Sequence, residues 1–442
     1  MDRLFAAVRA GDLERADVLL RELPDVGLGG EVGSVLLREA AVAGQAEMVE
    51  RLLWSGADPN RAWPGGVEPV RWFAEHGAWN MLLTVLKHDG SPSWWPTVAE
   101  SSLRAALDLA RTWLAVDPEQ RLCRRLDALD NPATVVERER VPAWRDGGPT
   151  AMRIRVRAAD GRQDQIWAAH RAVVTLLEHE LGIVTPNDEL AERAVYTADP
   201  DSWDYAQAQT TIAERVGHDA EVFNWLAARL VHPAVEHRLF AAQIAHDLSF
   251  REQTFDVQAV DTLADRIRDE PDPAVLDSLI GAFAEYGLRA RPGTDLREIL
   301  PHARHHDPSV RKRVATELVV ATGSRRNPML RGPASPPLSA VITTLIELAA
   351  DPDPGTREAA LHVLADSYLD TAQVHAIFTG HLSDPHPPAR IQAAVGLAFR
   401  DDLRGREVLY RLQTDPATAD VARGQLADLD RFLARQPPPP QH

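Results

Sequence analysis

Two histidines, His302 and His306, stand four residues apart, directly before an aspartate and a proline. On an α-helix this spacing places both imidazoles on one face, where they could bind a metal ion. No glutamate lies between them, as it would in a helical zinc-protease motif, and no third ligand follows at a fixed spacing. On the alternative interpretation they form a surface helix end, where protonated imidazoles suit the helix dipole. We therefore expect no cofactor and no metal, with His302 and His306 as the metal candidates should one bind.

The most basic stretch of the chain begins here and runs from Arg304 to Arg331. It holds seven basic residues against two acids, a balance of +5 in a chain whose net charge is −17. Guanidinium groups grip carboxylates and phosphates in a two-pronged geometry, so this stretch could bind an anion or an acidic peptide. The candidate anion-binding residues are Arg313, Arg325, Arg326 and Arg331. Alternatively, part of the charge is structural, because Arg311 belongs to a repeated motif described below.

A second group of arginines alternates with apolar residues between positions 152 and 157. A period of two is typical of a β-strand with one buried face. The arginines are Arg153, Arg155 and Arg157. They could form a basic stripe that grips a carboxylate or phosphate of a partner. Alternatively, they form a solvated face and pair across the sheet with Glu137 and Glu139.

Tryptophan is confined to one part of the chain, since all eleven lie between Trp54 and Trp225. Trp94 and Trp95 are adjacent in a turn between two prolines, where they could form an exposed aromatic contact. Alternatively, they pack inside the cap that ends the preceding helices. The full set of candidate partner-binding residues is Trp63, Arg71, Trp94, Trp95, Arg153, Arg155 and Arg157.

Two further groups could do acid–base work. His237, His246 and Asp247 lie close together in the sequence, and His179 adjoins Glu180. Neither group has a nucleophile or a glycine-rich turn beside it, and the chain contains no nucleophile elbow, paired-cysteine zinc site or dinucleotide fingerprint. We therefore assign no catalytic residue.

The elements that position these residues are most regular near the N-terminus. Residues 35–60, VLLREAAVAGQAEMVERLLWSGADPN, predict two short antiparallel helices whose apolar residues recur at helical spacing. Gly44 ends the first helix, where glycine adopts a positive φ at little cost. The same glycine recurs as Gly11 and Gly77, in steps of 33 residues.

This period and content resemble the ankyrin repeat over about residues 1–90. The third unit reads Glu-Pro-Val-Arg from position 68, where the family has Thr-Pro-Leu-His. Only Pro69 matches, so the hydrogen bond between the threonine and histidine of the family is not carried over. The resemblance implies a stack of helical hairpins with a broad binding surface, and it names no partner. Helices in 97–113 and 117–129 are expected to cap this stack.

Residues 134–167 break the helical pattern. Residues 134–141 are β-branched and alternating, and Asp160 with Gly161 is typical of a type I′ hairpin turn. Ile166 and Trp167 would lie on the return strand. The segment 144–149 is expected to be a flexible loop, and its two glycines are too few to indicate a phosphate-binding loop.

From residue 231 onward each predicted helix begins near an Asp-Pro or His-Pro pair. The pairs start at His232, Asp272, Asp307, Asp353 and Asp384. Aspartate caps a helix N-terminus, and proline fits the first turn because its missing N–H would have no partner there.

This pattern resembles the HEAT repeat, especially the short bacterial type with Asp-Pro-x-Val-Arg. In that family the aspartate and the arginine form a ladder between neighbouring units. Arg311, Arg357 and Arg390 match the arginine position, whereas Leu276 does not, so the resemblance implies a ladder that is interrupted there.

The fold class is therefore predicted as mainly α: ankyrin repeats plus a HEAT-like α-solenoid, with a small β-hairpin insert. A chain of 442 residues is too long for one ordinary core. The expected parts are ankyrin repeats at 1–90, capping helices at 91–133, the insert at 134–167, connecting helices at 168–230, HEAT-like repeats at 231–434 and a disordered tail at 435–442.

These features favour a repeat-protein scaffold that binds a protein or peptide partner. They favour the absence of enzymatic activity over its presence. The alternative is an enzyme or accessory factor acting on a peptide or small molecule in a cleft between the two repeat arms. A HEAT-like DNA glycosylase is disfavoured, because nucleic acid would meet a net charge of −17. The single cysteine, Cys123, indicates a reducing cytoplasm, and the early acids argue against a signal peptide. No apolar run approaches a length of about 18 residues, so no membrane span is expected. The resemblance to the short HEAT type implies a bacterial protein. The oligomeric state is left open.

Overall fold

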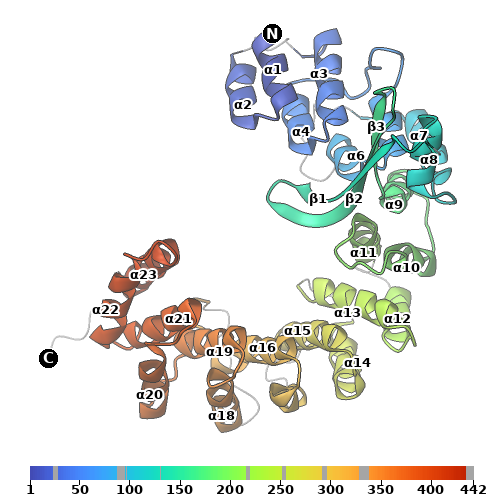
Figure 1. Cartoon of the computed structure of the whole chain (residues 1–442). Helices are drawn as coiled ribbons and strands as arrows, with labels where there is room; N and C mark the ends of the chain where they lie inside the picture. The colour runs from blue at the N-terminus through green and yellow to red at the C-terminus, as the bar shows by residue number, and fades with distance from the viewer. Residues whose placement is uncertain are drawn as a thin grey trace. The chain divides into compact units, whose positions relative to one another are not determined.

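The computed structural model of the chain is mainly helical, with one small sheet, and has a helical repeat fold (Figure 1). It describes residues 1–22, 28–86, 95, 97–129, 131–215, 220–250, 255–290, 296–327 and 338–434. The predicted disordered tail, 435–442, lies outside these residues. The chain forms two compact units, Met1–Arg215 and Val216–His442, here called unit 1 and unit 2. The helices that follow the sheet therefore divide between the units at residue 215.

Unit 1 begins with three helical hairpins. Their helices are α1 (Asp2–Ala10) with α2 (Leu13–Arg21), α3 (Glu31–Val42) with α4 (Ala46–Trp54), and α5 (Pro69–His76) with α6 (Trp79–Val85). The apolar faces predicted around residues 36–53 are buried, so the expected hairpin pattern is confirmed. Gly11, Gly44 and Gly77 lie in the turns within the hairpins, each with a positive φ between 65° and 79°.

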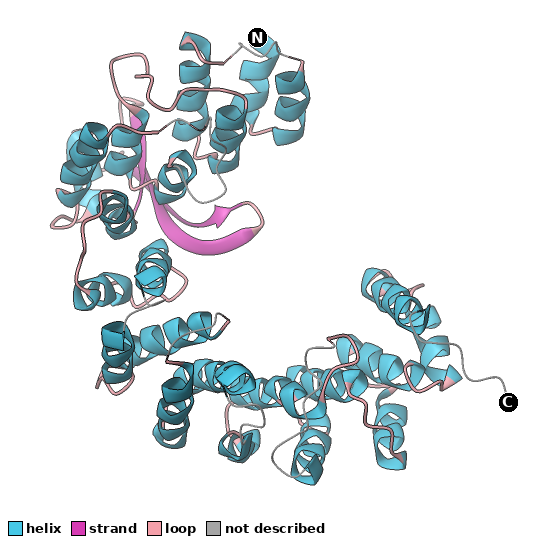
Figure 2. Ribbon diagram, turned by 180° about the vertical axis from the view of Figure 1, so that it is seen from behind, coloured by secondary structure: helices cyan, strands magenta, loops and turns pink. Residues whose placement is uncertain are grey.

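In the rest of unit 1, three strands follow two helices along the chain and precede three more. Its elements are α7 (Glu100–Arg111), α8 (Pro118–Arg125), β1 (Val135–Trp144), β2 (Gly147–Arg157), β3 (Gln163–Trp167), α9 (His170–Glu180), α10 (Asn187–Val195) and α11 (Trp203–Arg215). The strands form one antiparallel sheet in the order β1-β2-β3. Figure 2 shows β1 and β2 as a long curved ribbon.

The predicted alternation along β2 is confirmed, because it separates the two faces of the sheet. Ile154 and Val156 are buried with Ile166 in a core that includes residues of α8. The opposite face carries the arginines, and directly opposed residues of paired strands project to the same side. On that face Glu139 opposes Arg153 and Glu137 opposes Arg155.

The predictions for two loops of the sheet were wrong in detail. Residues 144–149 are not a flexible loop, because Trp144 pairs with Gly147 across a tight turn and the strands continue on both sides. The connection at residues 158–162 is longer than a type I′ turn. The Ala158 N–H donates to the Arg162 carbonyl at 2.8 Å, and only Gly161 there has a positive φ, whereas a type I′ turn needs two.

Unit 2 is a succession of helices joined by short turns. The α-helices are α12 (Ala220–Arg229), α13 (Val235–Ser249), α14 (Asp256–Asp269), α15 (Pro273–Ala290), α16 (Pro308–Glu317), α17 (Val319–Thr322), α18 (Leu338–Ala349), α19 (Pro354–Asp366), α20 (Ala372–His381), α21 (Pro387–Ala398), α22 (Leu403–Leu412) and α23 (Ala419–Ala434). Two 3₁₀ segments, η2 (Leu296–Glu298) and η3 (Leu300–Arg304), precede α16.

The predicted aspartate caps are present at three helices. Asp272, Asp307 and Asp353 accept backbone N–H groups of the first turns of α15, α16 and α19. The other two Asp-Pro-like pairs do not open a helix directly. α13 begins two residues after Pro233, and α21 begins at Pro387, two residues after Pro385.

Neighbouring helical pairs of unit 2 are joined by an arginine–acid node. The arginine lies four residues after the helix N-cap and donates to both oxygens of an acid in the next helical pair. That acid precedes its own helix N-cap by two residues and also accepts the N–H of the capping residue. The three nodes within the described part of unit 2 are Arg238–Glu270, Arg311–Asp351 and Arg357–Asp384.

The node explains both the confirmed and the missed parts of the predicted ladder. The acid is not the Asp-Pro aspartate, which caps its helix, but the residue two positions earlier. Arg238 was missed because Pro233 lies outside α13, which shifts the motif by two residues. Leu276 occupies the arginine position and is buried. The acid that would pair with an arginine at position 276 is replaced by His305, two residues before the N-cap Asp307. The Nδ1 atom of His305 accepts the Asp307 N–H at 3.1 Å. The arginine and its acid are therefore both absent, and no buried carboxylate lacks its arginine here.

Candidate partner-binding site

The arginine face of the sheet lies against the turns of the helical hairpins in unit 1. At Gly77 a Cβ atom would lie 2.1 Å from the carbonyl oxygen of Trp167 in β3. At Gly44 it would lie 3.1 Å from the indole of Trp167 and 3.5 Å from the guanidinium of Arg153. Glycine at these turns therefore serves two purposes, because it permits the positive φ and lets the sheet approach.

Three hydrogen bonds attach the sheet to the hairpins. The Arg145 N–H donates to the Glu47 carboxylate at 2.6 Å. The Asn80 amide donates to the Ala143 carbonyl at 2.8 Å, and the Gln165 amide donates to the Val42 carbonyl at 2.8 Å. The sheet is therefore held along the row of turns, and the spaces that remain between them form two adjoining cavities.

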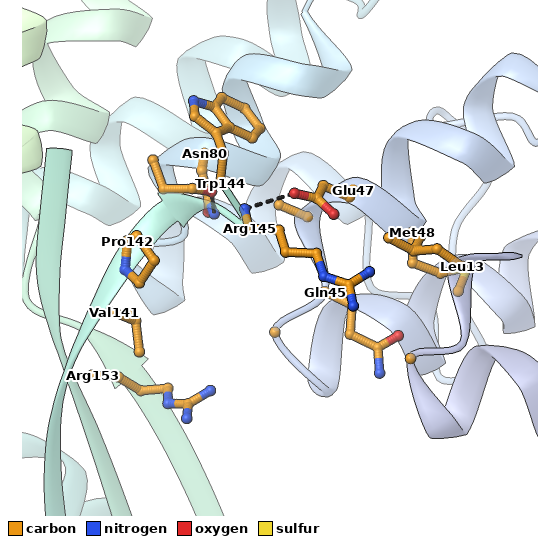
Figure 3. Close-up of a pocket in the computed structure, with 14 residues that line it drawn as sticks. Leu13, Gln45, Glu47, Met48, Asn80, Val141, Pro142, Trp144, Arg145 and Arg153 are labelled. Atoms are coloured by element: carbon orange, nitrogen blue, oxygen red, sulfur yellow. Dashed lines mark hydrogen bonds between the residues drawn. The ribbon is translucent and has the colours of Figure 1, made fainter. Parts of the chain in front are cut away.

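The smaller cavity, here called the turn pocket, has a volume of about 260 Å³. Its labelled lining residues come from Gln45 and the first turns of α2, α4 and α6, and from β1, β2 and their connection (Figure 3). The Gln45 side chain lies in this pocket, and its Oε1 is buried without a hydrogen-bond partner among the described residues. An unsatisfied buried acceptor is unfavourable, and a bound donor would remove the cost.

The larger cavity, here called the arginine groove, has a volume of about 850 Å³. It shares Gln45 with the turn pocket. Helices α1, α3 and α5 form one wall, and β2 and β3 form the other. The lining residues that carry charge or an aromatic ring are Arg9, Arg38, Glu39, Trp72, His76, Arg155, Arg157 and Asp164.

Four arginines face only two carboxylates in the groove lining. The Glu39 carboxylate lies 2.9 Å from the Arg9 guanidinium and 3.8 Å from the Arg38 guanidinium. Arg155 is offset by Glu137, which opposes it at 3.4 Å from outside the lining. Arg157 has no ion-pair partner within the described residues. The groove therefore has surplus positive charge on both walls.

The second carboxylate, Asp164, is held within a network at the end of the groove. Its side chain pairs with Arg125 and lies 3.5 Å from His76 Nε2. His76 donates through Nδ1 to the Trp72 carbonyl at 2.8 Å, and its ring stacks on Trp72. Burial opposes ionisation of Asp164, but the hydrogen bond from His76 and the charges of His76 and Arg125 lower its pKa. Asp164 is therefore an ionised, already paired group.

The predicted partner-binding residues divide into three groups. Arg155 and Arg157 line the arginine groove, and Arg153 lines the turn pocket. Arg153 pairs with Glu139 and Arg155 with Glu137, as the alternative interpretation of cross-strand pairing predicts, whereas partner binding by these arginines stays a prediction.

Trp63 and Trp95 are buried, at 3% and 4% exposure, and Trp63 packs against Trp72. Their indoles are core groups and offer no surface to a partner. Arg71 is exposed on α5, and Trp94 lies outside the described residues.

The groove adds residues that sequence reasoning missed, chiefly Arg9, Arg38, Trp72 and Gln45. One signal was available, because Arg38 precedes Arg71 by the 33-residue repeat period. The others carry no motif, since they reach the site only through packing of the hairpin turns against the sheet.

The predicted anion-binding residues of unit 2 are largely paired. Arg313 lies 2.9 Å from Asp277 and 3.2 Å from Glu317. Arg325 donates to the Ser367 carbonyl, and Arg326 contacts Asp366 at 3.8 Å. Both line a small cavity of about 210 Å³.

Arg331 lies outside the described residues. Anion binding in this region stays a prediction, and the structure supplies carboxylates for most of its charge.

The histidine candidates do not share one helical face. His302 lies in the short 3₁₀ segment η3, which ends at Arg304, and His306 lies beyond it. Burial lowers the pKa of His302. Within the described ranges, no group of three or more His, Cys, Asp or Glu residues is arranged to hold a metal ion.

The histidines of the two acid–base groups lie on α13 and α9. His179 lies near the exposed Glu214 at 3.4 Å. His246 is packed against Gly281, where a Cβ atom would lie 2.8 Å from its Nε2.

Comparisons with known proteins add little. No family model matches the chain, and no curated protein matches it significantly. Among solved structures, the Escherichia coli protein YibA is 16% identical, with a TM-score of 0.41 over 57% of this chain and 93% of that chain. An engineered protein is 13% identical, with a TM-score of 0.36 over 97% of this chain and 99% of that one. These similarities are too low to carry an argument. Among the described helices, none combines the length and apolar character needed to cross a bilayer.

Proposed function

We propose that this protein is a repeat scaffold that binds a protein or peptide partner, and that the arginine groove of unit 1 is a contact site for that partner. The observation that carries the proposal is the groove itself. A cavity of about 850 Å³ lies within the range, about 300–1,000 Å³, of pockets that hold small ligands. It therefore suits a few residues of an extended peptide.

The finer identity of the repeats belongs to this proposal. Turn glycines with positive φ at a 33-residue period support an ankyrin-like arrangement for about residues 1–90. Capping aspartates and the arginine–acid nodes support a HEAT-like arrangement for residues 231–434. Both repeat types build extended surfaces from units that stack on their neighbours. We propose a cytoplasmic location on the basis of the single cysteine.

The test is a pull-down in which the groove is blocked. Ala43 is exposed and lines the groove, so Ala43→Trp would fill it without entering the core. The control is Ala99→Trp, at an exposed alanine outside the groove lining. The full chain and both variants are immobilised and exposed to extract of the source cells.

We expect the wild type and Ala99→Trp to retain a partner in stoichiometric amount, and Ala43→Trp to lose it. Recovery of no stoichiometric partner, or equal retention by Ala43→Trp, would refute the proposal. Circular dichroism of all three proteins shows whether the variants keep the helical content of the wild type.

A further inference from the structure

The arginine groove has the opposite charge to the chain that contains it. The chain has a net charge of −17, yet the groove lining has four arginines and two carboxylates. Elsewhere, an exposed cation such as Arg304 has an acid nearby that offsets it, in this case Glu347. A local surplus within an acidic protein focuses a negatively charged group on this cavity and away from the remaining surface.

We infer that the partner segment is an extended acidic peptide, in which carboxylates flank an apolar residue. This inference rests on the proposed function and specifies the partner chemistry at the same site. Among the four arginines of the groove lining, Arg38 on the helical wall and Arg157 on the sheet wall are the two least neutralised by carboxylates. Each can therefore form a charge-assisted pair with a carboxylate of the peptide.

The groove lining also has an apolar part. Val42 is an exposed valine on α3, and Trp72 presents a half-buried indole from α5. Trp72 is held rigid by stacking against His76 and by edge contact with Phe73. A rigid indole beside an exposed aliphatic side chain is a favourable surface for one apolar residue of a bound peptide.

The Gln45 amide distinguishes a peptide from a phosphate group. Its buried Oε1 needs a hydrogen-bond donor, and a peptide backbone supplies N–H groups whereas a phosphate oxygen only accepts. The groove thus combines a cationic rim, an apolar patch and a free acceptor, which together match an acidic peptide.

The probe is a fluorescein-labelled peptide, Glu-Glu-Leu-Glu-Glu, and the readout is fluorescence anisotropy with the full chain at low and moderate salt. The groove variant is the double substitution Arg38→Gln with Arg157→Gln. The control is Arg3→Gln with Arg61→Gln, which changes the net charge equally at exposed arginines outside the groove lining. Arg38 and Arg157 are both exposed, so the groove variant is expected to fold.

We expect the acidic peptide to bind, and the groove variant to weaken its binding about tenfold or more, since charged contacts across an interface are lost. The control should bind within about twofold of the wild type, because distant exposed charges are screened. Added salt should weaken binding to the wild type. A Lys-Lys-Leu-Lys-Lys peptide should not bind.

The inference fails if the acidic peptide does not bind at low salt or if both double variants weaken it equally. Tighter binding of the lysine peptide or of a single-stranded oligonucleotide would also overturn it. Loss of the partner in Ala43→Trp together with no binding of acidic peptide would leave the scaffold proposal intact and remove only this inference. Retention of the partner in Ala43→Trp would remove the scaffold proposal first.

Discussion

The two units connect neighbouring repeats by different means. In unit 1 the hairpin turns end in glycine, and a sheet is laid across them, with a backbone carbonyl at the place where a Cβ atom of Gly77 would be. In unit 2 an arginine of one repeat reaches an acid of the next, as Arg311 reaches Asp351 at 2.7 Å and 2.8 Å. The link in unit 1 is a close steric contact between the sheet and a turn, whereas the link in unit 2 is a buried ion pair.

The arginine groove and the turn pocket both lie where the sheet of unit 1 meets the hairpins. The sheet contacts the hairpin turns at Gly44 and Gly77, and residues of the hairpins and the sheet together line the two cavities. The link in unit 2 is local, because each arginine also donates to two carbonyls in its own loop. It therefore requires no additional layer. In unit 1, the inserted sheet supplies one wall of both the turn pocket and the arginine groove.

The largest expected effect is at a unit 2 node. Arg311→Leu leaves Asp351, whose side chain is only 7% exposed, without its arginine. Removing one partner of a buried ion pair costs about 3–5 kcal/mol. Urea denaturation followed by circular dichroism measures the loss.

The control is Arg304→Leu, which breaks the exposed pair with Glu347 and should cost about 1 kcal/mol or less. Equal losses in the two variants would show that the node is no more than a surface contact.

Two buried carboxylates, Asp351 in unit 2 and Asp204 in unit 1, should make stability depend on pH with opposite signs. At Asp351 burial opposes ionisation, but the hydrogen bonds and charge of Arg311 lower the pKa. A lowered pKa contributes stability above about pH 4 that is lost as the pH falls through the folded-state value. In unit 1, burial raises the pKa of Asp204 to about 7. A raised carboxyl pKa has the opposite sign, so stability falls as the pH rises from about 4 to 7.

Asp204→Asn should remove this penalty in unit 1. The asparagine oxygen can still accept the Ala172 N–H, which donates to Asp204 at 2.7 Å. One pKa unit corresponds to about 1.4 kcal/mol, so the variant should gain on the order of 2–4 kcal/mol at pH 8 and little at pH 4. Ten of the eleven tryptophans precede residue 216, so tryptophan fluorescence during denaturation reports chiefly on unit 1. A gain of the same size at both pH values would contradict the assignment.

The close packing of the sheet on the hairpin turns of unit 1 is tested at Gly77, beside the Trp167 carbonyl. Gly77→Ala forces a side chain to positive φ and towards the Trp167 carbonyl, and we expect a loss of about 2–3 kcal/mol by fluorescence-monitored denaturation. Gly56→Ala is the matched control, because Gly56 has φ +90° but no atom within 4 Å of its Cβ position. It should lose only about 1 kcal/mol. If the two losses are the same, the sheet does not press on the turn.

The smallest expected effect concerns the gap in the unit 2 ladder. Leu276→Arg alone and His305→Asp alone should each destabilise the protein, because each introduces a charge without its partner. The double variant should recover about 1–2 kcal/mol relative to the sum of the single losses. A double-mutant cycle in urea measures this coupling. A coupling free energy of zero would mean that these two positions are not equivalent to those of the intact nodes.

Several parts of the molecule could be predicted from local sequence. Helical spacing around residues 36–53 placed the buried faces of α3 and α4, and the period of two in β2 separated its apolar and arginine faces. The cross-strand partners Glu137 and Glu139 followed from the same alternation. Tryptophan was harder, because an indole suits both a core and an interface, and Trp63 and Trp95 proved to be core residues.

By itself, the sequence determined the repeating helices, their capping residues and the strand alternation, because these depend on residues a few positions apart. Only the tertiary structure decided where the sheet lies, and with it the groove. The Gln165 side chain bonds to Val42, 123 residues earlier, and Asn80 bonds to Ala143, 63 residues later. Contacts at such separations leave no period in the sequence, since they arise from how one packed layer settles on another.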